Sequence, residues 1–127
     1  MGLKDLLGKN IYVTTPQDKD AFFHPRRYSK PKEEVVTIVL RVIGSLKDWR
    51  VEEHRENQGR IHASRSALFP PSAQDINIYV VQGTDGVTKL EMTSQTSGGG
   101  KADFGRNKKN IREFLGRMDE TLIPSRD

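Results

Sequence analysis

The sequence predicts an α+β fold: a single antiparallel sheet of four to five strands with two helices packed on one face. Residues 49–96 alternate between apolar and polar side chains in short runs separated by turn residues, which is typical of β-hairpins. A long apolar segment precedes this region, and a segment with helical periodicity follows it. The chain has 127 residues with no internal repeat and no linker, so we expect one domain over 1–127.

Residues 1–30 are expected to supply one strand and an irregular segment. The run "IYVTT", at 11–15, has the composition of a short strand. Residues 16–31 contain three prolines and many charges, which favours irregular structure. Phe22 and Phe23 lie in this segment and are expected to hold it against the body of the domain.

The core is expected over 31–123, and its first element is ambiguous by composition. In "PKEEVVTIVLRVIGSL", at 31–46, the β-branched residues favour a strand, whereas Pro31 followed by two glutamates favours a helix start. Thr37, Arg41 and Ser45 recur every four residues and leave a wide apolar face. We therefore predict a mostly buried helix that ends near Gly44.

Two hairpins are predicted next. "WRVEEHRE" and "RIHASRSA" flank "NQG", and "DINIYVVQ" and "VTKLEMTSQ" flank "GTDG". Ile76, Ile78 and Val80 share one face of their strand. "LFPPSA", at 68–73, is expected to interrupt the sheet between the hairpins, because proline cannot donate to a strand ladder.

The final element is a helix, because apolar residues from Ile111 onward recur at helical spacing. Asp103 is a suitable N-cap, and Pro124 lies just beyond the predicted end. The order is therefore strand, helix, four antiparallel strands, helix. This order matches a TATA-binding-protein-like or helix-grip-like arrangement, which does not by itself indicate a function.

Composition limits the possible functions. The chain has no cysteine, which excludes thiolate catalysis, thiolate metal sites and disulfides, and a cytoplasmic location is expected. The net charge is +4, and the charges are spread along the chain, so a solvated surface is favoured over a nucleic-acid footprint. No apolar run approaches the roughly 20 residues that span a membrane, so no membrane span is expected.

Two blocks of the second half resemble a known family. The first block contains Arg65, Ser66, Phe69 and Asp75. The second contains Ser94, Ser97, Gly100, Asp103, Gly105, Asn107 and Arg112. Over roughly 33–118 the chain resembles the bacterial and plastid domain-of-unknown-function family fourteen ninety-nine (DUF1499), and its most specific part is Asp-Phe-Gly-x-Asn followed by "IREFL".

The chain departs from this family at two places. Members often carry Ser-Ala-Ser-Arg where this chain has "SQTS" at 94–97, so an arginine is missing. The cysteine-bearing opening of many members is absent as well. The family has no settled activity, so the resemblance implies a fold and little about function.

The glycine-rich stretch "TSQTSGGGKADFGRN", at 93–107, fails as a nucleotide loop. Ala102 stands where a P-loop needs Ser or Thr, and Asp103 stands where a dinucleotide loop needs its last glycine. A strand-to-helix turn is the simpler interpretation. Four cations surround this predicted helix start, either for an anionic partner or as ordinary surface charge, namely Lys101, Arg106, Lys108 and Lys109.

Two of the histidines form a candidate metal site. If "NQG" is a three-residue loop, His54 faces His62 and Glu52 faces Ser64. A cross-strand histidine pair beside a carboxylate has ligands that zinc accepts. Histidines on the open face of a hairpin are more often solvated, so we expect no metal and no cofactor.

Arg65 is the charge that conflicts with the pattern. It alternates with Ile61 and Ala63, which are expected to face inward. A buried charge needs a partner, so we expect either an ion pair with Glu53 or Asp103 or a strand end that leaves the core. The alternative is an arginine that lines a pocket beneath the sheet, ready for a carboxylate or phosphate.

The functional hypothesis is a non-enzymatic domain that binds a small anionic ligand or a protein between the sheet and the helices. No serine stands in a nucleophile-elbow pattern and no carboxylate pair stands out, which disfavours an enzyme. The candidate binding residues are Arg65, Ser66, Lys101, Asp103, Arg106 and Asn107. The alternative is nucleic-acid or other polyanion binding by the basic residues Lys101, Arg106, Lys108, Lys109 and Arg112.

Overall fold

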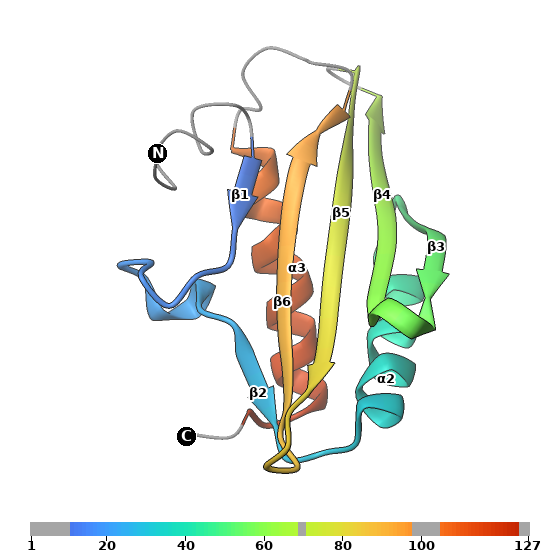
Figure 1. The fold of residues 1–127 in the computed structure, drawn as a ribbon. Helices are drawn as coiled ribbons and strands as arrows, with labels where there is room; N and C mark the ends of the chain where they lie inside the picture. The colour runs from blue at the N-terminus through green and yellow to red at the C-terminus, as the bar shows by residue number, and fades with distance from the viewer. Residues whose placement is uncertain (1–10, 69–70, 98–104, 125–127) are drawn as a thin grey trace.

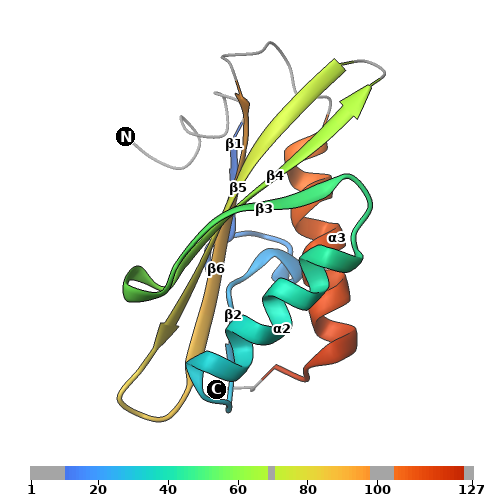
Figure 2. The same ribbon diagram turned by 90° about the vertical axis from the view of Figure 1, so that its right-hand side faces the viewer.

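The computed structural model describes residues 11–68, 71–97 and 105–124, which form one antiparallel sheet with two helices on one face (Figures 1 and 2). The strands are β1 (Ile11–Val13), β2 (Arg26–Tyr28), β3 (Trp49–Arg55), β4 (Arg60–Leu68), β5 (Pro71–Gln82) and β6 (Thr88–Thr96). The helices are α2 (Lys32–Ser45) and α3 (Arg106–Thr121), with short 3-10 turns η1 (Ala21–Phe23) and η2 (Glu56–Gln58). The predicted α+β fold is confirmed.

The sheet order is β1-β6-β5-β4-β3, and β2 also pairs with β6. β1 and β2 take successive stretches of the same edge: β1 lies opposite 93–95 of β6, and β2 lies opposite 88–90 (Figure 1). The described residues therefore form six strands, one more than the upper limit predicted. The additional strand is β2, which lies within the segment that was expected to be irregular.

The predicted interruption between the hairpins is wrong. β4 and β5 pair along their full overlap, from Arg60 opposite Tyr79 to Leu68 opposite Pro71. Pro71 is the first residue of β5, a position where a missing N–H costs the ladder little. β3, β4, β5 and β6 consequently form one continuous meander.

One face of the sheet carries the core. Alternate residues of the three central strands are fully buried: Ile61, Ala63, Ile76, Ile78, Val80, Leu90 and Met92. Against them pack Val35, Ile38, Val39, Val42 and Ile43 of α2, and Ile111, Phe114, Leu115 and Met118 of α3. The ambiguous segment is therefore a helix, and its predicted polar stripe of Thr37, Arg41 and Ser45 is exposed.

The N-terminal segment is held as predicted. Phe23 is fully buried, and the ring of Phe22 meets it edge-on at a centroid distance of 5.3 Å. Neither helix of the described residues combines the length and apolar character needed to cross a membrane.

The start of α3 differs from the expectation. Gly105 occupies the N-cap position, with a φ of 76° in the left-handed region that favours glycine. The cap was predicted at Asp103, which lies outside the described residues. The glycine two positions later therefore sets the turn into the helix.

Candidate functional site

The helix-covered face of the sheet turns polar at one end. β5 continues its inward positions from Ile78 and Ile76 to Gln74, and β6 continues from Met92 to Ser94. On α3, Asn107 and Asn110 precede Phe114 on the same side at helical spacing. Gln74, Ser94, Asn107 and Asn110 are all at least 98% buried. These polar residues therefore occupy inward-facing positions of their strands and helix, where the pattern otherwise has apolar residues.

Hydrogen bonds join these buried groups across the interface. Ser94 Oγ donates to Asn107 Oδ1 at 2.8 Å, and Asn110 Nδ2 donates both to Ser94 Oγ and to Gln74 Oε1 at 3.1 Å. Asn107 Nδ2 also donates to Thr96 Oγ1 at 3.1 Å. Burial of unpaired polar groups would be costly, so this pairing fixes the orientation of α3 on the sheet.

Arg65 extends the network toward solvent. Its Nη1 donates to Asn110 Oδ1 at 3.0 Å and to Glu113 Oε1 at 2.8 Å. The Arg65 side chain is 18% exposed, and the Glu113 side chain is 32% exposed. Its Nε and Nη2 have no acceptor among the described residues, and neither atom is buried. One edge of the guanidinium is thus fixed while another remains available.

Arg65 forms an ion pair, as predicted, but the predicted partner was wrong. The carboxylate comes from Glu113 on α3. Glu53 instead lies 2.9 Å from Arg55 on its own strand. Asp103, the other expected partner, lies outside the described residues. The pairing depends on how α3 docks, which strand periodicity does not specify.

Trp49 stands directly opposite Arg65 in the β3–β4 pairing. It is 8% exposed and stacks on Phe114 at a centroid distance of 6.0 Å. Its Nε1 is buried and has no hydrogen-bond acceptor among the described residues. A buried N–H without an acceptor is uncommon, and an oxygen from water or a ligand would satisfy it. The sequence pattern did not indicate that Trp49 lies beside Arg65.

A second arginine reaches the same region. Arg106 Nη1 donates to Ser72 Oγ, and Gln74 Nε2 donates to the same hydroxyl at 3.2 Å. The polar end cluster is defined by these connected residues: Arg65, Ser72, Gln74, Ser94, Thr96, Arg106, Asn107, Asn110 and Glu113.

Three of the predicted binding residues belong to this cluster: Arg65, Arg106 and Asn107. Ser66 does not, because it follows Arg65 in the strand, lies on the opposite face and is exposed. Lys101 and Asp103 lie outside the described residues. Gln74 and Asn110 were missed, although each sits where the apolar pattern of its element predicts an inward side chain.

A family model described as "Protein of unknown function (DUF1499)" matches residues 4–118. The chain belongs to this family. The match begins well before position 33, where the recognisable resemblance started, so it includes the N-terminal strands. No match was found among curated proteins.

Five of the residues that carry the family resemblance form two groups in this DUF1499 domain. Arg65, Ser94 and Asn107 belong to the polar end cluster. Asp75 and Ser97 meet on the outer face of the sheet, where Ser97 Oγ donates to Asp75 Oδ2 at 2.7 Å. The same carboxylate lies 3.0 Å from His62 Nε2 through its Oδ1.

This outer-face group does not have the geometry of a catalytic triad. Burial raises the pKa of Asp75, but the hydrogen bonds from Ser97 and then His62 outweigh it, so the pKa lies below its usual value. The carboxylate lies between the serine and the histidine. His62 and Ser97 each meet a different oxygen of Asp75, which is not the serine–histidine–aspartate order of a catalytic triad.

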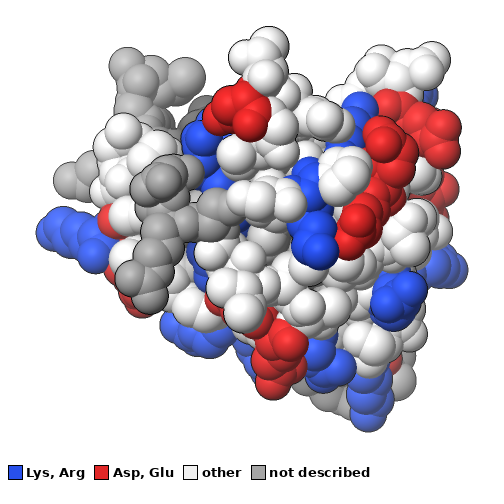
Figure 3. Space-filling view, turned by 90° about the horizontal axis from the view of Figure 1, so that it is seen from below, with Lys and Arg blue, Asp and Glu red and all other residues white. Residues whose placement is uncertain are grey.

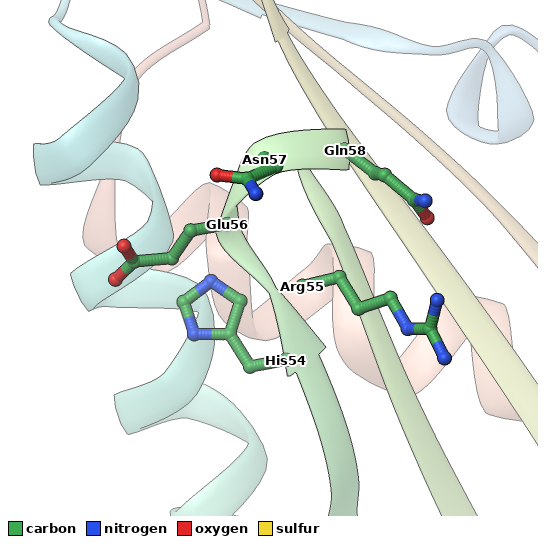
Figure 4. Close-up of a pocket in the computed structure, with 5 residues that line it drawn as sticks. All are labelled: His54, Arg55, Glu56, Asn57 and Gln58. Carbon is green, nitrogen blue, oxygen red and sulfur yellow. The ribbon is translucent and has the colours of Figure 1, made fainter.

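The predicted histidine pairing in this DUF1499 domain is wrong. The register of β3 on β4 shifts between Val51 and Glu53, so His54 lies opposite Ile61 while Glu53 lies opposite His62. A one-residue bulge moves the following side chains to the other face. His54 consequently points toward α2 (Figure 4). No group of three or more potential metal-binding side chains occurs in the described part of the chain.

The basic start of α3 is partly engaged by the protein itself. Lys108 Nζ lies 5.8 Å from the ring centroid of Tyr12 and 5.2 Å from that of Phe23. The guanidinium of Arg112 lies 5.5 Å from the Phe23 ring centroid. Elsewhere, the lower end of the molecule mixes cationic and anionic side chains instead of presenting a continuous basic patch (Figure 3). The ring contacts of Lys108 and Arg112 indicate that these two cations pack against the N-terminal segment.

Proposed function

We propose that this domain is a non-enzymatic binding module for a small carboxylate or phosphate ligand at the exposed edge of the polar end cluster. The observation that supports the proposal is the half-engaged guanidinium of Arg65. Asn110 and Glu113 hold Nη1, while Nε and Nη2 stay available. A planar guanidinium edge of this kind matches two oxygens of a carboxylate or phosphate.

Two neighbours would complete the site. The indole N–H of Trp49, on the strand opposite Arg65, lacks an acceptor among the described residues. A ligand oxygen close to both side chains would satisfy this donor. Arg106, linked through Ser72 and Gln74, adds a second positive charge at the same end.

Glu113 limits the expected affinity. Its carboxylate already neutralises part of the Arg65 charge at 2.8 Å, and a bound anion would be repelled by it. We therefore expect a weak, salt-sensitive site, with dissociation constants for simple anions on the order of 1 mM.

Tryptophan fluorescence tests the proposal, because Trp49 is the only tryptophan in the chain. Titration with citrate or inorganic phosphate should change its emission in a saturable way. Arg65→Gln should abolish the saturable change. Arg60→Gln is the matched control on the same strand, since Arg60 donates to Asn77 on the outer face and should leave the titration intact. Identical titrations for wild type and Arg65→Gln would refute the assignment.

Polyanion binding by the start of α3 is the second and weaker proposal, motivated by the adjacent cations Lys108, Lys109 and Arg112. The contacts of Lys108 and Arg112 with aromatic rings argue against it. It predicts that affinity for a labelled DNA oligonucleotide falls steeply with salt and is reduced in Lys109→Ala. An affinity for DNA that does not change with salt concentration would refute this second proposal.

A further inference from the structure

α2 and the β3–β4 hairpin lie at the far side of the domain from the strands β1 and β2 (Figures 1 and 2). A groove lies between α2 and the hairpin. Its volume is about 470 Å³. The helix side is lined by Lys32, Glu33, Val36, Thr37 and Leu40, and the hairpin side by His54, Glu56 and Asn57. Figure 4 shows His54 and Glu56 pointing toward α2, whereas Arg55 points away from it.

The groove has an apolar floor that packs against the core on one side and stays partly exposed on the other. Val36 and Leu40 are one helical turn apart on α2, and both are only partly buried. The fully buried apolar residues of α2 face the sheet instead. An apolar side chain entering the groove would remove the exposed parts of Val36 and Leu40 from water.

The other wall belongs to the strand at the sheet edge. β3 is the last strand in the order, so among the described residues its outer side pairs with no other strand. An edge strand offers unpaired N–H and C=O groups to an extended peptide, whose alternate side chains then enter a neighbouring groove. The register shift between Val51 and Glu53 restricts such pairing to a short segment near His54.

The charged side chains of the groove indicate what kind of peptide it would bind. The carboxylates of Glu33 and Glu56 form no ion pair within the described residues. The nearby cation, Lys32 Nζ, instead donates to the backbone oxygen of Glu56 at 3.3 Å. The groove thus presents two unpaired acids on a protein whose net charge is +4. A basic side chain in the peptide would complement them.

We infer that the α2–β3 groove binds a short extended peptide segment of a partner protein. An apolar residue of the peptide lies over Val36 and Leu40, and a neighbouring Lys or Arg faces Glu33 and Glu56. This interaction is separate from the proposed anion site at Arg65, which lies in the half of β4 farther from the hairpin turn.

Chemical-shift mapping with two blocked hexapeptides tests the inference. One alternates valine with lysine, and the other alternates valine with glutamate. The lysine peptide should perturb amides of 36–40 and 53–57, and the glutamate peptide should bind at least about fivefold more weakly. Equal binding of the two peptides, or perturbations that map elsewhere, would contradict the inference.

Matched variants separate the groove from general surface effects. Val36→Asp should weaken lysine-peptide binding by about tenfold or more, whereas Val81→Asp, on a valine that is 53% exposed, should not. Glu33→Lys combined with Glu56→Lys should reverse the preference toward the glutamate peptide without touching the core. Unchanged preference in this double variant would overturn the charge argument. Concentration-dependent shifts of the same amides without peptide would identify a second copy as the occupant and overturn it too.

Discussion

The contact between α3 and the sheet has two halves that differ in chemistry. In the C-terminal half, Ile111, Phe114, Leu115 and Met118 pack on apolar strand residues. In the N-terminal half, Asn107 and Asn110 meet Ser94, Thr96 and Gln74 through directional hydrogen bonds. The α3 residues of both halves are at least 99% buried, so burial alone does not explain the polar residues.

The difference indicates separate contributions to the fold. Apolar burial is non-directional and supplies most of the stability. A hydrogen-bonded amide network contributes less net free energy, but its bonds are all formed in only one orientation of the helix. The polar half also ends in Arg65, the point where the interior connects to solvent. We therefore expect large stability losses from the apolar half, and effects on both orientation and binding from the polar half.

The largest effect should come from Phe114→Ala in the apolar half. Phe114 is fully buried and stacks on Trp49, so its loss should lower the free energy of unfolding by about 3–5 kcal/mol. Urea denaturation measures this. Ile123→Ala is the control, because that residue is 91% exposed and should change stability by less than about 0.5 kcal/mol. A loss under about 1 kcal/mol for Phe114→Ala would contradict the claim that the apolar half supplies most of the stability.

Asn110→Ala should have the next largest effect. Asn110 accepts from Arg65 and donates to Ser94 and Gln74, so the substitution leaves these partners unsatisfied. We expect a loss of about 2–3 kcal/mol in urea denaturation. Asn57→Ala, on an exposed asparagine of η2, should be nearly neutral. Equal small losses for both asparagines would mean that the network contributes nothing.

The smallest effect concerns Asp75 on the outer face. The pKa of Asp75 in the folded state lies below its usual value of 3.8, so its ionised form stabilises the fold above that pH. This stabilisation disappears as pH falls from about 3.8 through the lower folded pKa. Because the side chain is 46% exposed, the contribution should stay below about 1 kcal/mol.

Asp75→Asn tests this contribution by urea denaturation at a series of pH values. The variant should lose less stability than wild type on acidification below about pH 4. Ser97→Ala should shift the curve in the same direction by a smaller amount, because it removes one of the two hydrogen bonds to Asp75. Parallel curves for wild type and Asp75→Asn would contradict the lowered pKa.

Much of the fold follows from periodicity. Alternation identified the inward face of β5, and it marked Arg65 as a charge on an inward face. Helical spacing identified α3, and the polar stripe of Thr37 and Arg41 distinguished α2 from a strand. These predictions succeed because the period of burial is a local property of each element.

The partners across the interface were not predictable in the same way. Glu113 meets Arg65 because of how α3 docks, and that geometry is set by the whole core. The bulge after Val51 separated His54 from His62, and no residue in the sequence marks it. Pro71 begins a strand, although prolines were expected to interrupt the sheet. Register, bulges and docking depend on distant contacts, which periodicity does not contain.

The most direct test compares ligand-induced stabilisation in the two halves of the α3 contact. We predict that citrate at ten times its dissociation constant raises the free energy of unfolding of wild type by about 1.4 kcal/mol. Met118→Ala, in the apolar half, should be destabilised yet show the same increment, because the substitution leaves the proposed anion site unchanged. Arg65→Gln should show none. An equal increment in Arg65→Gln, or none in wild type, would contradict the account.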